Sequence, residues 1–268
     1  MTGSTAQDLA SWWGVHEFPA NRWVQWEIGP LRLSVLRRPR EWRIAWRSDG
    51  DRLDPVCRRS DDNVEPPTLE NDDIRRYIGQ GEDNRLEFVP RLADRPVVVN
   101  PDIPVFLPPG EKTTLYVSTA AWLRLAEPDG SMLTEIPVYR PSDTWFGPNT
   151  REGEIAYASR TSARTSLDEL TVLHHRVITP VRIDNRGVDA LLVEQLRIPV
   201  PALTLYEIEG QGLWTGTVAF TRREGDNTAT LQIQDGRELP GPDPRQLAPP
   251  RVPVERNAVV HAFSRIFS

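Results

Sequence analysis

The sequence predicts an all-β protein of two closely packed lobes, each an antiparallel β-sandwich of the jelly-roll or immunoglobulin type, with a short C-terminal helix. Two observations carry this fold class. Apolar and polar residues alternate in many short runs, which is the pattern of a strand with one buried face. Turn residues separate these runs at intervals of about 8–12 residues, which is typical of β-sandwiches.

The clearest alternation lies between residues 23 and 47. The apolar side chains that share one face of three successive runs are Val24, Trp26, Ile28, Leu31, Leu33, Val35, Trp42, Ile44 and Trp46. Gly29-Pro30 and the stretch Arg38-Pro39-Arg40 provide the turns between the runs. We therefore expect an antiparallel meander here, with its tryptophans packed in the core.

The remaining runs and turns suggest a division of the chain into lobes. We expect an N-terminal lobe over residues 12–140, interrupted by an irregular acidic insertion at residues 49–83, and a C-terminal lobe over residues 141–235. Residues 236–268 start with a proline-rich polar tract that has the composition of an extended tail.

Two stretches have apolar residues near helical spacing. Residues 254–267 contain Val259, Val260, Phe263 and Ile266, which predicts a short amphipathic helix at the C-terminus. Leu69–Ile78, inside the acidic insertion, has a rougher version of the same spacing and is a second candidate for a short helix.

Composition narrows the class of protein. A hydrophobic content of 38% with a net charge of −6 is typical of a globular chain, and the acidic balance argues against nucleic-acid binding. Cys57 is the only cysteine, which excludes a disulfide framework and a multi-thiolate metal site. No nucleotide-binding fingerprint occurs, so no cofactor is expected. With neither a signal peptide nor a long apolar run, we expect a cytoplasmic protein without membrane insertion.

The meander also carries an excess of basic residues. Between Arg22 and Arg47 seven arginines (22, 32, 37, 38, 40, 43 and 47) face two glutamates, a balance of +5. Such a surface suits an anion or an acidic partner. It equally suits a solvated sheet face on which arginine stems cover apolar surface. We favour the solvated face, because the acidic insertion that follows carries a balance of −6 and neutralises the meander.

Residues 137–161 form an unusual stretch in the middle of the chain. Pro137, Pro141 and Pro148 each lack a backbone donor, and charged residues surround the adjacent aromatics Trp145 and Phe146. The candidate ligand-binding residues of this loop are Arg140, Asp143, Trp145, Asn149, Arg151, Glu152, Glu154, Tyr157 and Arg160.

Three interpretations of this loop remain open. Its arginines suit bidentate binding of a carboxylate or phosphate. Asp143 with Glu152 or Glu154 suits a carbohydrate-active hydrolase, which needs two carboxylates about 5–10 Å apart, with Trp145 as a sugar platform. The third is a structural junction, with both aromatics wedged between two β-halves. We favour the junction and assign no catalytic residue, because three arginines balance three carboxylates.

Metal and thiol chemistry find little support. His174 and His175 are adjacent in a strand-like run, so their side chains are expected on opposite faces and cannot chelate one ion together. A metal site needs at least three convergent ligands, and none is recognisable. Cys57 has arginines but no histidine nearby, and we interpret it as a passive thiol.

Several phrases together resemble a known family. They are Pro108–Glu111, Leu115–Thr119, Arg140–Pro148, Glu152–Glu154, Tyr157–Thr161, Pro180–Asn185, Leu203–Tyr206 and Leu213–Thr215. The sequence resembles the uncharacterised prokaryotic family called domain of unknown function 432, over most of residues 20–235. The resemblance implies no catalytic residues, because the family has none assigned. Some members look like attachments to small-conductance mechanosensitive channel domains, so it implies a possible channel partner.

The expected function is that of a non-enzymatic binding or regulatory module that recognises a protein partner or an anionic small ligand. The alternatives are the carbohydrate-active hydrolase described above and a structural subunit. The structural subunit would self-associate through its edge strands and its C-terminal helix.

Overall fold

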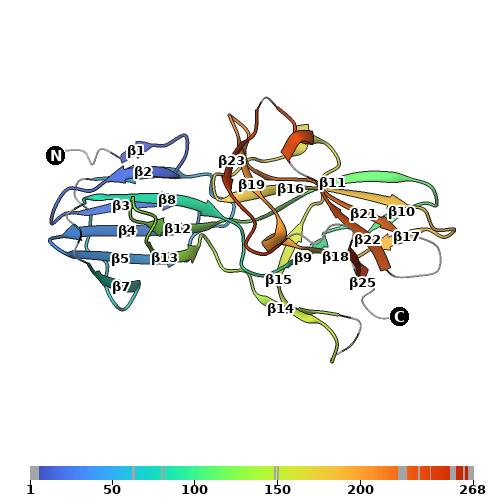
Figure 1. Cartoon of the computed structure of the whole chain (residues 1–268), viewed down its shortest axis with the longest axis horizontal. Helices are drawn as coiled ribbons and strands as arrows, with labels where there is room; N and C mark the ends of the chain where they lie inside the picture. Colours follow the sequence, from blue (N-terminus) through green and yellow to red (C-terminus); the bar gives the residue numbers. More distant parts are fainter. Residues whose placement is uncertain are drawn as a thin grey trace. The chain divides into compact units, whose positions relative to one another are not determined.

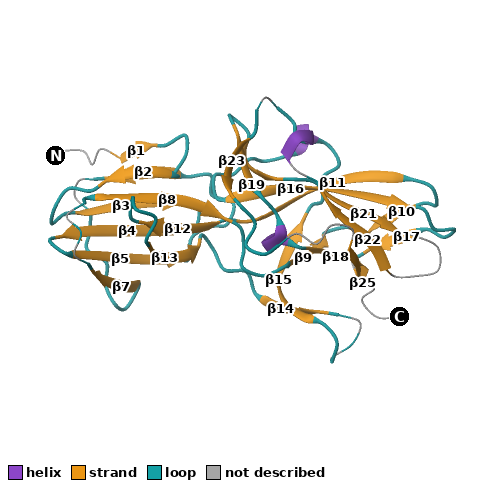
Figure 2. Cartoon of the chain, in the orientation of Figure 1, coloured by secondary structure: helices purple, strands orange, loops and turns teal. Residues whose placement is uncertain are grey.

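The computed structural model describes residues 6–61, 64–79, 81, 83–147, 149, 151–222, 228–234, 236–241, 243–253, 258–261 and 263–264. The protein is all-β, with several mostly antiparallel sheets, and the helices of the described residues are three short 3-10 turns (Figure 2). The chain divides into two compact units (Figure 1). Unit 1 consists of residues 1–91, 121–140 and 173–175, and unit 2 of residues 92–120, 141–172 and 176–268.

Unit 1 contains two antiparallel sheets. The larger has the strand order β1 (Ala6–Asp8), β6 (Cys57–Ser60), β3 (Trp23–Ile28), β4 (Leu31–Arg38), β5 (Glu41–Ser48) and β7 (Asp73–Ile78). The smaller has the order β13 (Met132–Pro137), β12 (Trp122–Ala126), β8 (Arg85–Arg91) and β2 (Gly14–Glu17).

The predicted meander is confirmed. Strands β3, β4 and β5 pair in sequence, with Val24 opposite Val35 and Val35 opposite Ile44. All nine apolar side chains predicted for the inner face are buried. One arginine differs from the expectation: Arg37 shares the inner face with Leu33 and Val35, is buried, and lies with its guanidinium 4.7 Å from the Trp42 ring centroid.

Aromatic side chains fill the space between the two sheets of unit 1. Trp26 of β3 contacts Phe88 of β8 at a ring-centroid distance of 4.9 Å, and Phe18 contacts Trp42 at 5.2 Å. Trp12, fully buried, donates its indole N–H to the carbonyl of His174 at 2.7 Å. The short segment Leu173–His175 is thereby held within unit 1, although its sequence neighbours belong to unit 2.

Unit 2 contains three sheets. The largest has the order β23 (Arg245–Ala248), β19 (Leu205–Ile208), β20 (Gly212–Thr215), β16 (Arg176–Asn185), β21 (Val218–Arg222), β22 (Thr228–Ile233) and β24 (Ala258–His261), with β11 (Lys112–Ala120) also on β16. The second has the order β14 (Asp143–Phe146), β15 (Glu154–Thr161), β9 (Val97–Pro101), β18 (Gln195–Ile198) and β25 (Phe263–Ser264). The third pairs β10 (Val105–Leu107) with β17 (Leu191–Val193).

Strand β16 organises the largest sheet. One edge pairs antiparallel with β11, from Lys112 opposite Asp184 to Ala120 opposite Arg176. The other edge pairs in parallel with β20 near Val177 and then with β21 from Val181 onward. In the second sheet β9 and β15 are also parallel. The 3-10 turns are η1 (Leu167–Glu169), η2 (Val200–Ala202) and η3 (Gly236–Glu238).

The prediction of a C-terminal helix is wrong. The described part of that stretch forms strands β24 and β25, which pair with β22 and β18. Residues 254–257, 262 and 265–267 of the predicted segment lie outside the described residues. Adjacent β-branched residues favour strand. A short isolated helix is marginal in water, whereas the edges of β22 and β18 offer this segment backbone hydrogen bonds.

The helix proposed for Leu69–Ile78 is also wrong. Asp73–Ile78 is strand β7, which covers the outer edge of β5 and places Ile74 opposite Ala45. Arg75 of β7 lies over the Trp46 ring at 5.0 Å. Pairing with β5 therefore overrides a weak helical pattern. Within the described residues, no helix is long and apolar enough to cross a membrane.

Candidate functional site

The candidate ligand-binding residues gather mainly on one hairpin of unit 2. Asp143 and Trp145 lie on β14, and Glu154, Tyr157 and Arg160 lie on β15. Asn149, Arg151 and Glu152 lie in the turn that joins these strands. Arg140 is exposed and belongs to unit 1. Strand β14 had no counterpart among the expected strands, because prolines and glycines on both sides obscure its four residues.

The hairpin register sorts these side chains onto two faces. Asp143 lies opposite Tyr157 and Trp145 opposite Ile155 on one face, and Phe146 lies opposite Glu154 on the other. Asp143 and Glu154 therefore point to opposite sides of the hairpin. This arrangement lends no support to an acid–base pair formed by these two carboxylates.

Each carboxylate of the hairpin has a partner within unit 2. Arg95 forms an ion pair with Asp143 at 3.1 Å, and Arg197 forms one with Glu154. Glu152 accepts a hydrogen bond of 3.2 Å from the Asn149 side-chain amide. The two arginine partners, Arg95 and Arg197, lie far from the hairpin in the sequence, so no local pattern could have identified them.

The turn between the strands is built around Asn149. Its side-chain oxygen accepts hydrogen bonds from the backbone N–H groups of Arg151 (2.8 Å) and Glu152 (2.9 Å), an arrangement that asparagine commonly makes in turns. Its carbonyl accepts the indole N–H of Trp145 at 2.9 Å. A Cβ on Gly153 would lie 2.8 Å from the Trp145 ring, so only glycine permits this approach.

The two aromatics of the loop have different environments. Phe146 is 5% exposed and packs with Val98 and Ala156 inside unit 2, as a core residue does. Trp145 is 46% exposed. The expectation that both aromatics act as a buried wedge is therefore wrong for Trp145, because strand alternation turns its ring to the opposite face from Phe146.

Tyr157, on β15 of the hairpin, is buried and bonded to the loop that precedes β9. Its hydroxyl donates to Asp94 at 2.8 Å, and the Arg95 guanidinium lies 5.5 Å from its ring centroid. Arg95 thus contacts both Asp143 and Tyr157, the two residues that oppose each other across the hairpin. Sequence analysis missed Asp94 and Arg95 because nothing in their local pattern marks them.

A hollow of about 540 Å³ lies beside the hairpin in unit 2. Its lining is Asp94, Pro96, Glu154, Arg197, Pro199, Pro201, Ala202, Leu231, Ile233, Val252 and Pro253. The Glu154–Arg197 ion pair is its main polar feature. Most of the wall is apolar and rich in proline, which suits an apolar group more than an ion.

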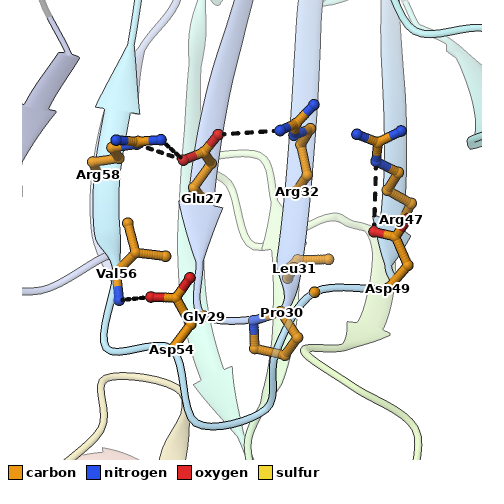
Figure 3. A pocket seen from close by; sticks show the side chains of 11 residues that line it. Glu27, Gly29, Pro30, Leu31, Arg32, Arg47, Asp49, Asp54, Val56 and Arg58 are labelled. Carbon is orange, nitrogen blue, oxygen red and sulfur yellow. Dashed lines mark hydrogen bonds and ion pairs between the residues drawn. The ribbon is translucent and has the colours of Figure 1, made fainter.

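A second hollow, of about 270 Å³, lies in unit 1 at the end of the meander (Figure 3). Its charged lining residues are Glu27, Arg32, Arg47, Asp49, Asp54 and Arg58. Glu27 accepts from Arg58 and, at 3.4 Å, from Arg32. The side chain of Asp54 accepts the Val56 backbone N–H at 3.0 Å. This hollow is small and polar, in contrast to the one in unit 2.

The histidines and the cysteine occupy structural positions. His174 and His175 lie in a turn that precedes β16, not in a strand. His175 is fully buried and donates from Nε2 to the Arg52 carbonyl at 3.0 Å, and burial lowers the pKa of His174. Burial raises the pKa of the Cys57 thiol to about 12. Among the described residues, no three His, Cys, Asp or Glu side chains cluster as a metal site would require.

Comparison with known families identifies the chain. The family model described as "Protein of unknown function (DUF432)" matches residues 12–267. The chain belongs to the DUF432 family. The resemblance seen in the sequence is thereby confirmed, and the match extends beyond the phrases that suggested it. No curated protein and no solved structure matches this DUF432 chain.

Proposed function

We propose that this DUF432 protein is a non-enzymatic binding module, and that the β14–β15 hairpin of unit 2 is the surface on which it binds a protein partner. One observation carries the proposal. The Trp145 ring is fixed by the Asn149 carbonyl and by its contact with Gly153, yet nearly half of its surface faces solvent. A large aromatic that is immobile before binding loses little side-chain entropy when a partner covers it.

The neighbourhood of Trp145 supports an apolar contact. Ile155 lies directly opposite Trp145 on β15 and is 54% exposed. The two side chains share one face, where cross-strand Cβ atoms are about 5 Å apart. Together they present a compact apolar patch with the Arg95–Asp143 ion pair beside it, which matches the apolar centre and polar rim of a binding surface.

The position of β14 supports an extended segment as the bound element. β14 ends the strand order of its sheet, with β15 as its strand neighbour among the described residues. The Ala158 N–H bonds to the Ser142 carbonyl at 2.8 Å. Because antiparallel pairs alternate, the backbone groups of Trp145 point away from β15. A partner strand adding to this edge would bond to that backbone and contact the indole.

The proposal also covers the fold of unit 1, the class of partner and the location of the protein. The contact between Trp26 of one sheet and Phe88 of the other supports a β-sandwich for unit 1. A membrane channel is one class of partner to test, because the family resemblance implies attachment of some members to channel domains. We place the module in the cytoplasm. The alternative to a protein partner at the β14 edge is a second copy of this chain.

The test compares two matched variants in partner capture. Trp145→Ala combined with Ile155→Ser removes the apolar patch, and Phe106→Ala removes an aromatic that is 69% exposed on β10 of the same unit. We expect capture of a specific partner to be lost with the first variant and kept with the second. With the partner bound, hydrogen exchange of the Asp143–Phe146 amides should slow. Undiminished capture by the double variant, or unchanged exchange in β14, would refute the proposal.

A further inference from the structure

The outer face of the larger sheet of unit 1 carries a row of four charged side chains. Strand register places Arg58 of β6 opposite Glu27 of β3, Glu27 opposite Arg32 of β4, and Arg32 opposite Arg47 of β5. Figure 3 shows these side chains on neighbouring strands at the wall of the 270 Å³ hollow. The row therefore contains two arginines directly opposite each other, a pairing that is unfavourable unless an anion bridges it.

Among the residues that the structure describes, no carboxylate bridges Arg32 and Arg47. Glu27 lies on the far side of Arg32, where it also accepts from Arg58 and, at 3.2 Å, from the Gln25 amide. The carboxylate nearest Arg47 is Asp49, whose oxygen is 3.6 Å from the guanidinium Nε, too long for a hydrogen bond. Asp49 is also 74% exposed, so solvent screens its charge.

Arg47 has a buried donor without an acceptor. Its Nε is shielded from solvent and has no hydrogen-bond partner in the described part of the chain. A buried donor left unsatisfied costs free energy, about 1–3 kcal/mol for an ordinary polar group and more for a charged one. The described residues therefore leave the Arg47 guanidinium incompletely hydrogen-bonded, and this side chain lines the hollow.

The same face of the same sheet contains an internal comparison. Arg43 of β5 lies directly opposite Arg76 of β7, again two arginines across a strand pair. There the chain provides the bridge: Glu41 accepts from Arg43 through one oxygen and from Arg76 through the other, at 2.7 Å for Arg76. The two guanidinium groups hold the pKa of Glu41 at about 2. A single carboxylate is therefore what this sheet uses to join two facing arginines.

The rim of the hollow is held in place by backbone hydrogen bonds. Gly50 donates to the Pro30 carbonyl at 3.2 Å, and Gly29 donates to the Val56 carbonyl at 2.8 Å. These bonds fix the β3–β4 turn against the loops on either side. The volume is below the range of about 300–1,000 Å³ typical of drug-sized ligands, so the hollow suits a small ion or the charged end of a molecule.

We propose that Arg32 and Arg47 bind a small oxyanion, a carboxylate or phosphate group, which bridges them as Glu41 bridges Arg43 and Arg76. Arginine presents a planar fork of donors that matches both groups. This site lies in unit 1 and does not depend on the partner surface proposed for unit 2.

The experiment titrates the full chain with inorganic phosphate or with acetate, against sodium chloride at equal ionic strength. The readouts are the side-chain Nε–H resonance of Arg47 and the thermal midpoint. We expect a saturable shift of that resonance and a rise in the midpoint with at least one oxyanion but not with chloride. A stronger effect of phosphate assigns the site to phosphate groups, and a stronger effect of acetate assigns it to carboxylates.

Three variants give the test its specificity. Arg32→Gln and Arg47→Gln should each weaken binding by about tenfold or more, since each removes a charged donor pair. Arg38→Gln removes an exposed arginine of β4 outside the hollow and should leave binding unchanged. Equal shifts with chloride, no saturation with either oxyanion, or equal weakening by Arg38→Gln would each overturn the proposal. If a variant fails to fold, the titration of the wild-type protein still decides the question, because the Arg47 resonance either shifts saturably with an oxyanion or does not.

Discussion

Gly29 lies directly against the imidazole of His175: a Cβ on Gly29 would stand 2.3 Å from Nδ1, and the Gly29 backbone has a φ of +52°. His175 belongs to the segment Leu173–His175 that completes unit 1. Its Nε2 donates to the Arg52 carbonyl, so the ring is fixed between two loops. The β3–β4 turn of the meander is therefore shaped by a residue that lies far away in the sequence.

Replacing Gly29 with alanine should destabilise the protein strongly. The left-handed backbone costs about 1–2 kcal/mol for a residue with a Cβ, and the overlap with His175 adds about 1–3 kcal/mol. The measurement is the free energy of unfolding in urea. Gly130→Ala is the control, because Gly130 has a φ of +89° but no atom within 4 Å of its added Cβ. Equal losses in the two variants would contradict the His175 contact.

The Glu41 bridge should make stability depend on acid pH. Hydrogen bonds from Arg76 and Arg43 lower the pKa of Glu41 from 4.5 to about 2. Since the folded pKa lies below the unfolded one, the stabilisation is complete above about pH 4.5 and is lost as the pH falls towards 2.

Glu41→Gln tests this dependence. The variant should be less stable than the wild type at pH 7, because two facing arginines lose their bridge. The difference in thermal midpoint should shrink as the pH falls from 4.5 to about 2, because wild-type Glu41 becomes protonated near its pKa. A difference that stays constant across this window would mean that the carboxylate charge does not contribute.

Cys57 should be inert in the folded protein. The thiol is 6% exposed, and desolvation, helped by Asp8, raises its pKa to about 12. Only the thiolate reacts readily with disulfide reagents, so labelling at pH 8 should be slow in the native state and rapid in urea. Because the thiol becomes accessible only through unfolding, the rate of native labelling at pH 8 and at pH 9 should not exceed the rate of global unfolding. Rapid stoichiometric labelling of the native protein would contradict the burial of Cys57.

Local patterns predicted the strands of the meander, because the alternation that marks each strand is local. The alternation around Val24, Leu33 and Ile44 specifies which face is buried, and short turns fix the neighbours. The alternation that buries Leu33 and Val35 also places Arg37 on the inner face, although its charge suggested a position in solvent. The ring of Trp42 and the Gly81 carbonyl, which accepts from Arg37 at 2.6 Å, make that burial possible.

The candidate site was only partly accessible from the sequence. The loop was recognised, and its polar residues do form a connected hairpin around Asn149. Its ion-pair partners Arg95 and Arg197 come from other strands and loops, which the sequence does not bring together. The facing pair Arg32 and Arg47 was likewise hidden, because it depends on the strand register between β4 and β5.

By itself, the sequence determined the all-β class, the strands of the meander, the buried face of each and the family, because period-two patterning and motif identity are local properties. Only the tertiary structure decided the rest. It turned the predicted C-terminal helix into strands β24 and β25, inserted Leu173–His175 into unit 1, and exposed Trp145 while burying Phe146. The first two have the same physical reason: open strand edges and core positions are filled by whichever segment the fold brings near, and sequence distance does not enter. For Trp145 and Phe146, the pairing of β14 with β15 set which of the two alternating faces is buried.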